Sequence, residues 1–213
     1  EIMPSLVGSE MCIRDSDDGN SQDTLQARIN GYLQLNGNKY PAQAIHRIDY
    51  ETSGLVLFCK HPFFQAYCDK NMEEHHIKKV YIALVQGHTN YKNKKIVSNI
   101  ARDRHNAKKM IIHPNGKESI SIFNTLKNYK DYSLIQVTIL TGRKHQIRVQ
   151  CASLKHPILN DSLYGGKRID NTGLLLQSHH IQFNDIDITC PQEKRFIMKK
   201  NCISFQISDP DTD

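Results

Sequence analysis

The pattern of hydrophobic and polar positions predicts a chain that mixes helices with strands. Apolar residues at helical spacing, or a proline in the first turn, indicate three helices: TLQARINGYL (24–33), PFFQAYCDKNMEEHH (62–76) and RKHQIRVQCASLK (143–155). Apolar runs and alternating patterns predict strands and hairpins elsewhere: GLVLFCK (54–60), KKVYIALVQG (78–87), residues 95–127, YSLIQVTIL (132–140) and GLLLQSHHIQF (173–183). Strands joined partly by hairpins and partly by helices indicate an α+β domain with a mixed or antiparallel sheet.

The first residues are unlike the rest of the chain. EIMPSLVGSEMCIRDSDDGNSQ (1–22) has no sustained periodicity, and it lacks the basic start and long apolar centre of a signal peptide. Its run SLVGSEMCIRDS resembles translated sequencing-adapter text. We therefore expect residues 1–22 to be a non-native or disordered segment, followed by one folded domain over residues 23–208 and a C-terminal tail at 209–213.

The charge of the chain points to an anionic partner. Lysine and arginine number 28 against 22 aspartates and glutamates, which gives a net charge of +6. Nucleic acid is the leading candidate for such a partner, although a basic surface without any partner gives the same balance. No apolar run approaches the length of a membrane span, so we do not expect an integral membrane protein.

Cysteine and histidine spacing gives no metal signature. The six cysteines contain no Cys-x-x-Cys pair, which argues against a zinc ribbon and is typical of a reducing compartment, hence the cytoplasm. Cys59 and Cys151 lie in apolar or motif segments and are expected to be core thiols. The histidines at 75–76 and at 179–180 are adjacent and point different ways in regular structure, so we expect no metal.

An ionisable cluster stands just before the apolar run at 54–60. Within it Asp49 precedes a Thr-Ser-Gly turn and a strand that must be buried, so its carboxylate needs a partner unless it caps the turn. The segment TGRKHQIRVQ (141–150) offers Arg143 and Arg148. An Asp49 paired with an arginine would stay ionised at neutral pH, as a nucleophile or base must. These residues alone favour a structural salt bridge over a catalytic pair.

Three segments in order resemble the motifs of the RluA-type family of RNA pseudouridine synthases. HRIDYETSG (46–54) resembles H-R-L-D-x-x-T-S-G, KKVYIALVQG resembles a motif with tyrosine two residues after lysine, and TGRKHQIRVQCASLKHPILNDSLYG (141–165) resembles the third motif. The resemblance spans about residues 24–205. It implies a catalytic domain with a mixed, largely antiparallel central sheet flanked by helices. The family's Asn-Lys-Pro-x-Gly turn is not found before the first motif, so we expect an N-terminally truncated domain.

The resemblance also implies a reaction: isomerisation of uridine to pseudouridine in structured ribosomal or transfer RNA, without a cofactor and with the target base flipped out. It assigns catalysis to Asp49, to Tyr81, which would stack on the base, and to Arg148, which would pair with the carboxylate. The resemblance and the basic charge together imply an RNA-binding set: Arg47, which would enter the RNA stack, with His46, Arg143, His145, Lys108 and Lys109.

Other interpretations stay open at the level of sequence. Tyr81 can be an ordinary core tyrosine, and Arg47 a surface residue paired with Glu51. The chain as a whole can be a non-catalytic RNA-binding module of the same fold, or an unrelated hydrolase that uses Asp49 with His46. We expect a monomeric cytoplasmic protein that acts on RNA.

Overall fold

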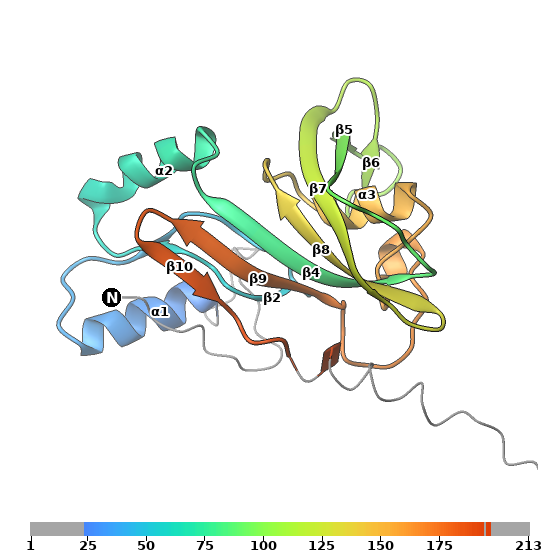
Figure 1. Cartoon of the computed structure of the whole chain (residues 1–213). Helices are drawn as coiled ribbons and strands as arrows, with labels where there is room; N and C mark the ends of the chain where they lie inside the picture. Colours follow the sequence, from blue (N-terminus) through green and yellow to red (C-terminus); the bar gives the residue numbers. More distant parts are fainter. Residues whose placement is uncertain (1–23, 194, 197–213) are drawn as a thin grey trace, which may run out of the picture.

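The computed structural model describes residues 24–193 and 195–196 of the 213-residue chain (Figure 1). One sheet of eight strands dominates them, in the order β10-β9-β4-β8-β7-β5-β6, with β2 pairing β9 off this path. Every pair is antiparallel except β2–β9. The strands are β2 (Ser53–Gly54), β4 (Lys78–Gln86), β5 (Lys94–Arg102), β6 (Met110–Ile112), β7 (Lys117–Asn128), β8 (Tyr132–Ile139), β9 (Leu176–Phe183) and β10 (Ile186–Thr189).

Helices flank the sheet at both ends. In the described residues the α-helices are α1 (Leu25–Leu35), α2 (Gln65–Glu73) and α3 (Gln146–Ser153). Figure 1 shows α1 and α2 at the β9–β10 end and α3 beside β5 and β6. Thr24 caps α1 by accepting a hydrogen bond from the Ala27 N–H at 3.1 Å, and the 3-10 turn Pro62–Phe64 leads into α2. The predicted α+β class and the three predicted helices are confirmed.

Strand β4 runs through the middle of the sheet because it is apolar on both faces. Every residue from Lys79 to Val85 is buried. Tyr81 pairs with Val137 of β8 on one side and with Ser178 of β9 on the other. The pairing with β9 shifts just before Tyr81, which marks a β-bulge. Bulges re-aim side chains and are common beside functional sites.

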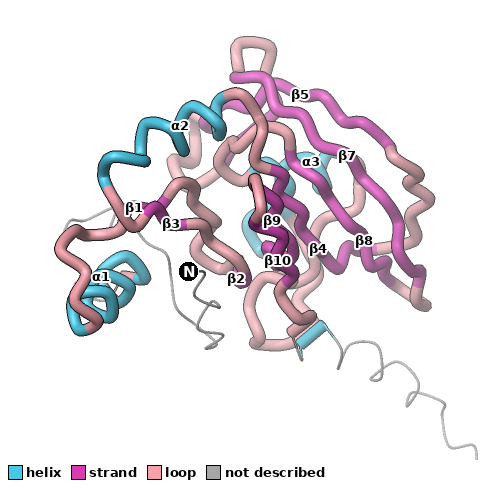
Figure 2. The backbone as a smooth tube through the Cα atoms, turned by 60° about the vertical axis from the view of Figure 1, so that its left-hand side comes forward, coloured by secondary structure: helices cyan, strands magenta, loops and turns pink. Residues whose placement is uncertain are grey.

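The strand predicted over residues 54–60 is wrong as a single strand. The structure divides it into β2, which pairs with β9, and β3 (Phe58–Cys59), which pairs with β1 (Gln43–Ala44). Gly54 causes the break, because its φ of +102° and its approach to Ser178 permit no side chain: a Cβ there would lie 2.1 Å from the Ser178 carbonyl oxygen. Figure 2 shows the β1–β3 pair between α1 and α2.

Side chains from β4, β7, β8 and β9 form much of the hydrophobic core. Its fully buried members include Phe123, Ile135 and Ile158. Cys59 and Cys151 are buried free thiols, as predicted. The predicted boundaries at residues 22/23 and 208/209, with the segment 1–22 and the tail 209–213, lie outside the described residues. None of the helices in the described part of the chain is long and apolar enough to cross a membrane.

Candidate active site

The first and third motifs meet at one cavity of about 540 Å³. Its wall is built from the loop 45–52, the end of α2, the middle of β4 and the segment 139–147. Five residues with a predicted role line it: His46, Arg47, Asp49, Tyr81 and Arg143. The cavity therefore joins segments that lie about a hundred residues apart in the sequence.

Asp49 directs its carboxylate to this cavity rather than to the turn that follows it. The turn is closed by the Asp49 backbone carbonyl, which accepts the Thr52 N–H at 2.8 Å. The side chain is 19% exposed. Burial raises the pKa of the Asp49 carboxyl, and Arg148, a hydrogen bond from the His145 backbone, Arg47 and Lys144 act in the opposite direction. Cations and one backbone donor thus partly offset the cost of a buried carboxylate.

Arg148 reaches Asp49, but its close partner is another carboxylate. Its Nη1 lies 4.0 Å from Asp49 Oδ2. Its Nε and Nη2 instead donate to the two carboxylate oxygens of Asp161 at 2.8 and 2.7 Å, a bidentate pair with Asp161 fully buried. The guanidinium carbon also lies 5.1 Å from the centre of the Tyr164 ring. Our sequence reasoning placed Asp161 and Tyr164 in the third motif but gave them no role.

Arg143, the second candidate partner from the sequence, does not pair with Asp49 in this structure. Its Nε donates to the Glu118 carbonyl oxygen of β7 at 2.9 Å, and the residue is exposed at the rim of the cavity. That position suits contact with an incoming phosphate better than support of the buried carboxylate.

His145 occupies the start of α3 in a left-handed conformation, with φ of +53°. Its ring Nδ1 lies 2.8 Å from the Tyr164 hydroxyl, which also accepts the Met110 N–H at 2.8 Å. Burial and the nearby cations, Arg148 first, lower the pKa of His145 to about 3, so its ring is neutral. The His145 backbone donates a hydrogen bond to Asp49, while its ring connects α3 to the β5–β6 hairpin through the Tyr164 hydroxyl.

His46 is likewise neutral. Its Nε2 accepts the Leu57 N–H at 3.1 Å. Burial, with Lys79 as the nearby cation, lowers the pKa of His46 to about 4. Its ring therefore carries no positive charge at neutral pH, and it holds the Asp49 loop against residues 55–57.

Tyr81 contributes an aromatic side chain to the cavity wall and is only 5% exposed as a whole. Burial raises the pKa of the Tyr81 phenol well above its ordinary value. The hydroxyl is therefore protonated at neutral pH, and the residue offers a ring face and a neutral phenol rather than a phenolate base.

The two predicted lysines of the β5–β6 hairpin differ in placement. Lys109 Nζ lies 5.6 Å from the centre of the Tyr164 ring, so it belongs to the surroundings of Arg148. Lys108 is exposed in the turn, where its backbone N–H bonds to Asn106 Oδ1 at 3.0 Å.

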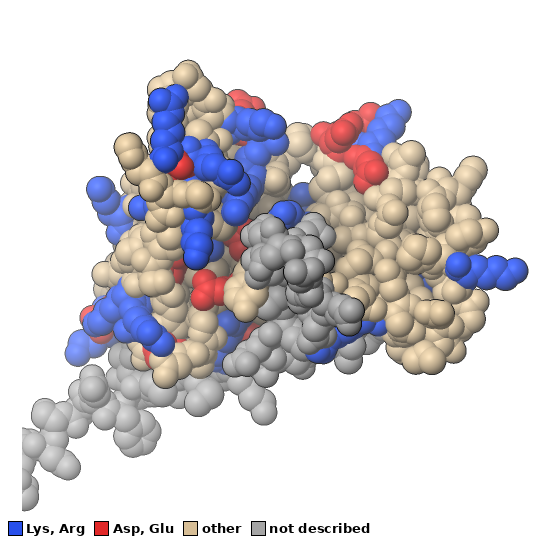
Figure 3. All heavy atoms as spheres, turned by 180° about the vertical axis from the view of Figure 1, so that it is seen from behind, with Lys and Arg blue, Asp and Glu red and all other residues tan. Residues whose placement is uncertain are grey.

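Seen from behind, lysine and arginine side chains gather over the half that carries β5–β7, and few lie over the end with α1 and α2 (Figure 3). Among the described residues, no group of three or more His, Cys, Asp and Glu is placed to hold a metal ion.

Comparison with known proteins identifies the family. The family model described as RNA pseudouridylate synthase matches residues 12–153. A Bacillus subtilis protein named an uncharacterized RNA pseudouridine synthase is 38% identical over 145 residues, which cover 67% of this chain and 48% of that protein. The ribosomal large subunit pseudouridine synthase D of Borreliella burgdorferi is 34% identical over 170 residues, covering 78% and 51% of the two chains. The chain thus spans about half the length of these curated relatives.

Solved structures share the fold. Human RNA pseudouridylate synthase domain containing 1 matches with a TM-score of 0.71 at 20% identity, covering 96% of this chain and 91% of that one. Human RNA pseudouridylate synthase domain containing 4 matches with a TM-score of 0.74 at 15% identity, covering 95% and 89%. With the family match over residues 12–153, this chain belongs to the RNA pseudouridylate synthase family. The RluA-type resemblance of its three motifs is thereby confirmed.

Proposed function

We propose that the chain isomerises specific uridines to pseudouridine in structured RNA, without a cofactor. Ribosomal RNA of the large subunit is the first candidate substrate, because a relative that covers much of this chain is named for it, and transfer RNA is the second. The observation that carries the proposal is that Asp49 and Tyr81 line one cavity of about 540 Å³, with Arg148 4.0 Å from the Asp49 carboxylate, in a member of this family.

The reaction needs a glycosidic bond that is accessible only outside the RNA stack. Flipping the nucleotide costs a few kcal/mol of lost stacking. Arg47, which is exposed at the cavity wall, is suited to fill the gap because a guanidinium stacks on bases and also meets phosphates. Arg143 at the rim, with Lys108 and Lys109 of the hairpin, would hold the RNA backbone on the same side.

Within the cavity, the C1′–N1 bond breaks, the uracil turns, C5 bonds to C1′, the C5 proton leaves and N1 gains a proton. Asp49 acts on the ribose or on the base to start this exchange, and Tyr81 offers its ring to the flipped uracil. Arg148 favours the ionised Asp49 from 4.0 Å. His145 and His46 position this machinery as neutral rings.

Release of tritium from C5-labelled uridine tests the proposal, with unmodified transcripts of large-subunit ribosomal RNA and of transfer RNAs as substrates. Release by the wild-type chain and its loss in Asp49→Asn are expected, while Asp187→Asn, which alters an exposed carboxylate on β10, keeps full activity. No release from a folded chain that still binds RNA would favour the non-catalytic RNA-binding module instead. Cleaved RNA or free uracil would indicate a hydrolase.

We further propose that the chain acts as a monomer in the cytoplasm. In its favour, Cys59, Cys68, Cys151 and Cys190 are all free buried thiols, which suits a reducing compartment. Light scattering coupled to gel filtration tests the monomer, and a mass of twice 24.5 kDa would contradict it.

A further inference from the structure

A buried lysine in the cavity wall has no part in the chemistry described above. Lys79 leaves only 4% of its surface exposed and lines the cavity from β4, two residues before Tyr81. Both residues pair in regular register with β8, Lys79 with Ile139 and Tyr81 with Val137. Alternate residues of a strand share a face and lie about 7 Å apart, so the two side chains leave β4 toward the same cavity.

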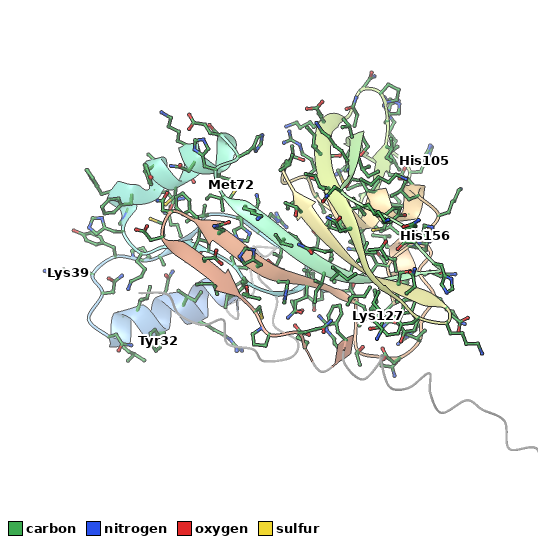
Figure 4. All side chains as sticks on the ribbon, viewed as in Figure 1. Tyr32, Lys39, Met72, His105, Lys127 and His156 are labelled. Carbon is green, nitrogen blue, oxygen red and sulfur yellow. The ribbon has the colours of Figure 1, made fainter. Side chains whose placement is uncertain are left out.

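In the part of the chain that the structure describes, no counter-ion lies beside the Lys79 ammonium group. Lys79 Nζ donates to the thioether sulfur of Met72 at 3.0 Å, and a thioether is a weak acceptor. Met72 belongs to the last turn of α2, and Figure 4 shows it on the side of that helix toward the sheet. On another side, a Cβ placed on Gly142 would lie 3.9 Å from Nζ, so the third motif passes close by. Within residues 24–193 and 195–196, no carboxylate oxygen lies within 4.0 Å of this nitrogen.

Such an arrangement is unfavourable for the free protein. An ammonium has three donors, and among the described residues the Met72 thioether takes one, so two remain for another partner. A buried charge without an opposite charge costs free energy, and burial lowers the pKa of Lys79 to about 8. A residue that packed only for stability would be apolar here, so the charge indicates a ligand that is absent from the free chain.

The position of Lys79 selects the part of the substrate that it meets. Arg148, Arg47 and Lys144 are the cations that act on the Asp49 carboxyl, and Lys79 adds a further cation to the wall of the same cavity. A uridine nucleotide with C1′ at Asp49 and its base on Tyr81 carries negative charge only on its phosphates, one on the 5′ side and one on the 3′ side. We propose that Lys79 binds a phosphate of the flipped nucleotide, as a substrate-binding residue of the cavity that rests on the proposed function.

Binding of small probes tests this assignment without RNA. Uridine 5′-monophosphate, uridine 3′-monophosphate and uridine are titrated calorimetrically into the wild type and three variants: Lys79→Met, Lys79→Arg and Lys78→Met. Lys78 is the matched control, because it is exposed at the start of the same strand. At least one monophosphate is expected to bind the wild type about tenfold or more tighter than uridine, since a charge-assisted hydrogen bond contributes that much.

The preference for that monophosphate over uridine is expected to disappear in Lys79→Met and to persist in Lys79→Arg and Lys78→Met. The monophosphate that loses affinity in Lys79→Met shows whether the lysine binds the 5′- or the 3′-phosphate. The proposal is overturned by a wild type that binds neither monophosphate more tightly than uridine, or by a Lys79→Met chain that keeps the preference. It is also overturned when uridine itself loses affinity equally in Lys79→Met, because the lysine then contacts the nucleoside.

Two further measurements separate this role from stability and from the proposed function. Lys79→Met is expected to unfold at no lower temperature than wild type, because burial opposes the charged form of lysine. If tritium is released, Lys79→Met raises KM about tenfold or more and leaves kcat within about twofold, as loss of uniform binding does. Absence of tritium release in every variant would refute the proposed function alone, because the probe titrations do not depend on turnover.

Discussion

The Asp161–Arg148 pair makes the sharpest prediction for stability. Asp161→Asn removes the negative charge that faces the Arg148 guanidinium. The Asp161 side chain has no exposed surface, and the Arg148 side chain is 6% exposed. Of the two hydrogen bonds, at 2.7 and 2.8 Å, one is lost because the asparagine NH2 group faces a guanidinium donor, and the other loses the negative charge of its acceptor. Breaking a buried ion pair by removing one partner costs about 3–5 kcal/mol. For a chain of this size each kcal/mol lowers Tm by about 2–4 °C, so we expect a fall of roughly 6–20 °C.

Thermal unfolding followed by circular dichroism measures this fall. Asp187→Asn is the matched control, since Asp187 pairs with His180 at 2.8 Å but its side chain is 60% exposed. The control should change the free energy of unfolding by less than about 0.5 kcal/mol. A Tm of Asp161→Asn within 2 °C of the control, an allowance of about 0.5 kcal/mol on this scale, would refute the assignment of the pair as a major stabilising interaction.

The same substitution tests whether Asp161 also sets the charge of Asp49. With Asp161 neutral, the full positive charge of Arg148 acts on Asp49 from 4.0 Å, which lowers the pKa of the Asp49 carboxyl. The acid limb of the pH profile for kcat/KM should then move to lower pH. A purely structural Asp161 would lower the rate at every pH and leave the limb in place.

Four more substitutions follow from the described contacts. Gly54→Ala should unfold at markedly lower urea concentration, because its Cβ would lie 2.1 Å from the Ser178 carbonyl oxygen, whereas Gly31→Ala in α1, with open space around it, should gain about 0.5–1 kcal/mol. Asp49→Asn should raise Tm at pH 7: the folded-state pKa of Asp49 is raised, so its stabilising contribution is lost as the pH rises through that pKa. An unchanged Tm difference between pH 4 and pH 8 would contradict this. Tyr164→Phe should cost about 1–3 kcal/mol in urea unfolding, because its hydroxyl bonds to the buried His145 ring and to the partly buried Met110 N–H, and an unchanged midpoint would argue against that network.

The long elements of the fold follow from local patterns in the sequence. The segment 78–86 forms β4 because its apolar run suits a strand covered on both faces, and Pro62 starts the helical segment at 62–73 as proline does at a first turn. The break after β2 could not be read from GLVLFCK, whose composition favours a continuous strand. It depends on Gly54 meeting Ser178 of β9, more than a hundred residues away, and that contact exists only in the folded chain.

Only part of the candidate active site could be predicted from the sequence. Asp49 and Arg148 are recognisable by motif, and they do lie within 4.0 Å. The dominant partner of Arg148 was not predicted, because three carboxylates approach the guanidinium and no local rule ranks them. Asp161 is the close partner of Arg148 because it is fully buried and its two carboxylate oxygens match both donors of one guanidinium edge.

The division of the Arg148 donors explains how the site keeps Asp49 available. The Nε and Nη2 atoms are fixed by Asp161, and only Nη1 faces Asp49, at a distance longer than a hydrogen bond. A bidentate pair with Asp49 would stabilise its carboxylate and occupy the lone pairs that must meet the substrate. With Asp161 holding the arginine in place, Arg148 favours the charged form of Asp49 through space, and the Asp49 carboxylate keeps lone pairs for the substrate beside the hydrogen bond from the His145 backbone. The buried Asp161 is therefore as necessary to this arrangement as the arginine that it holds.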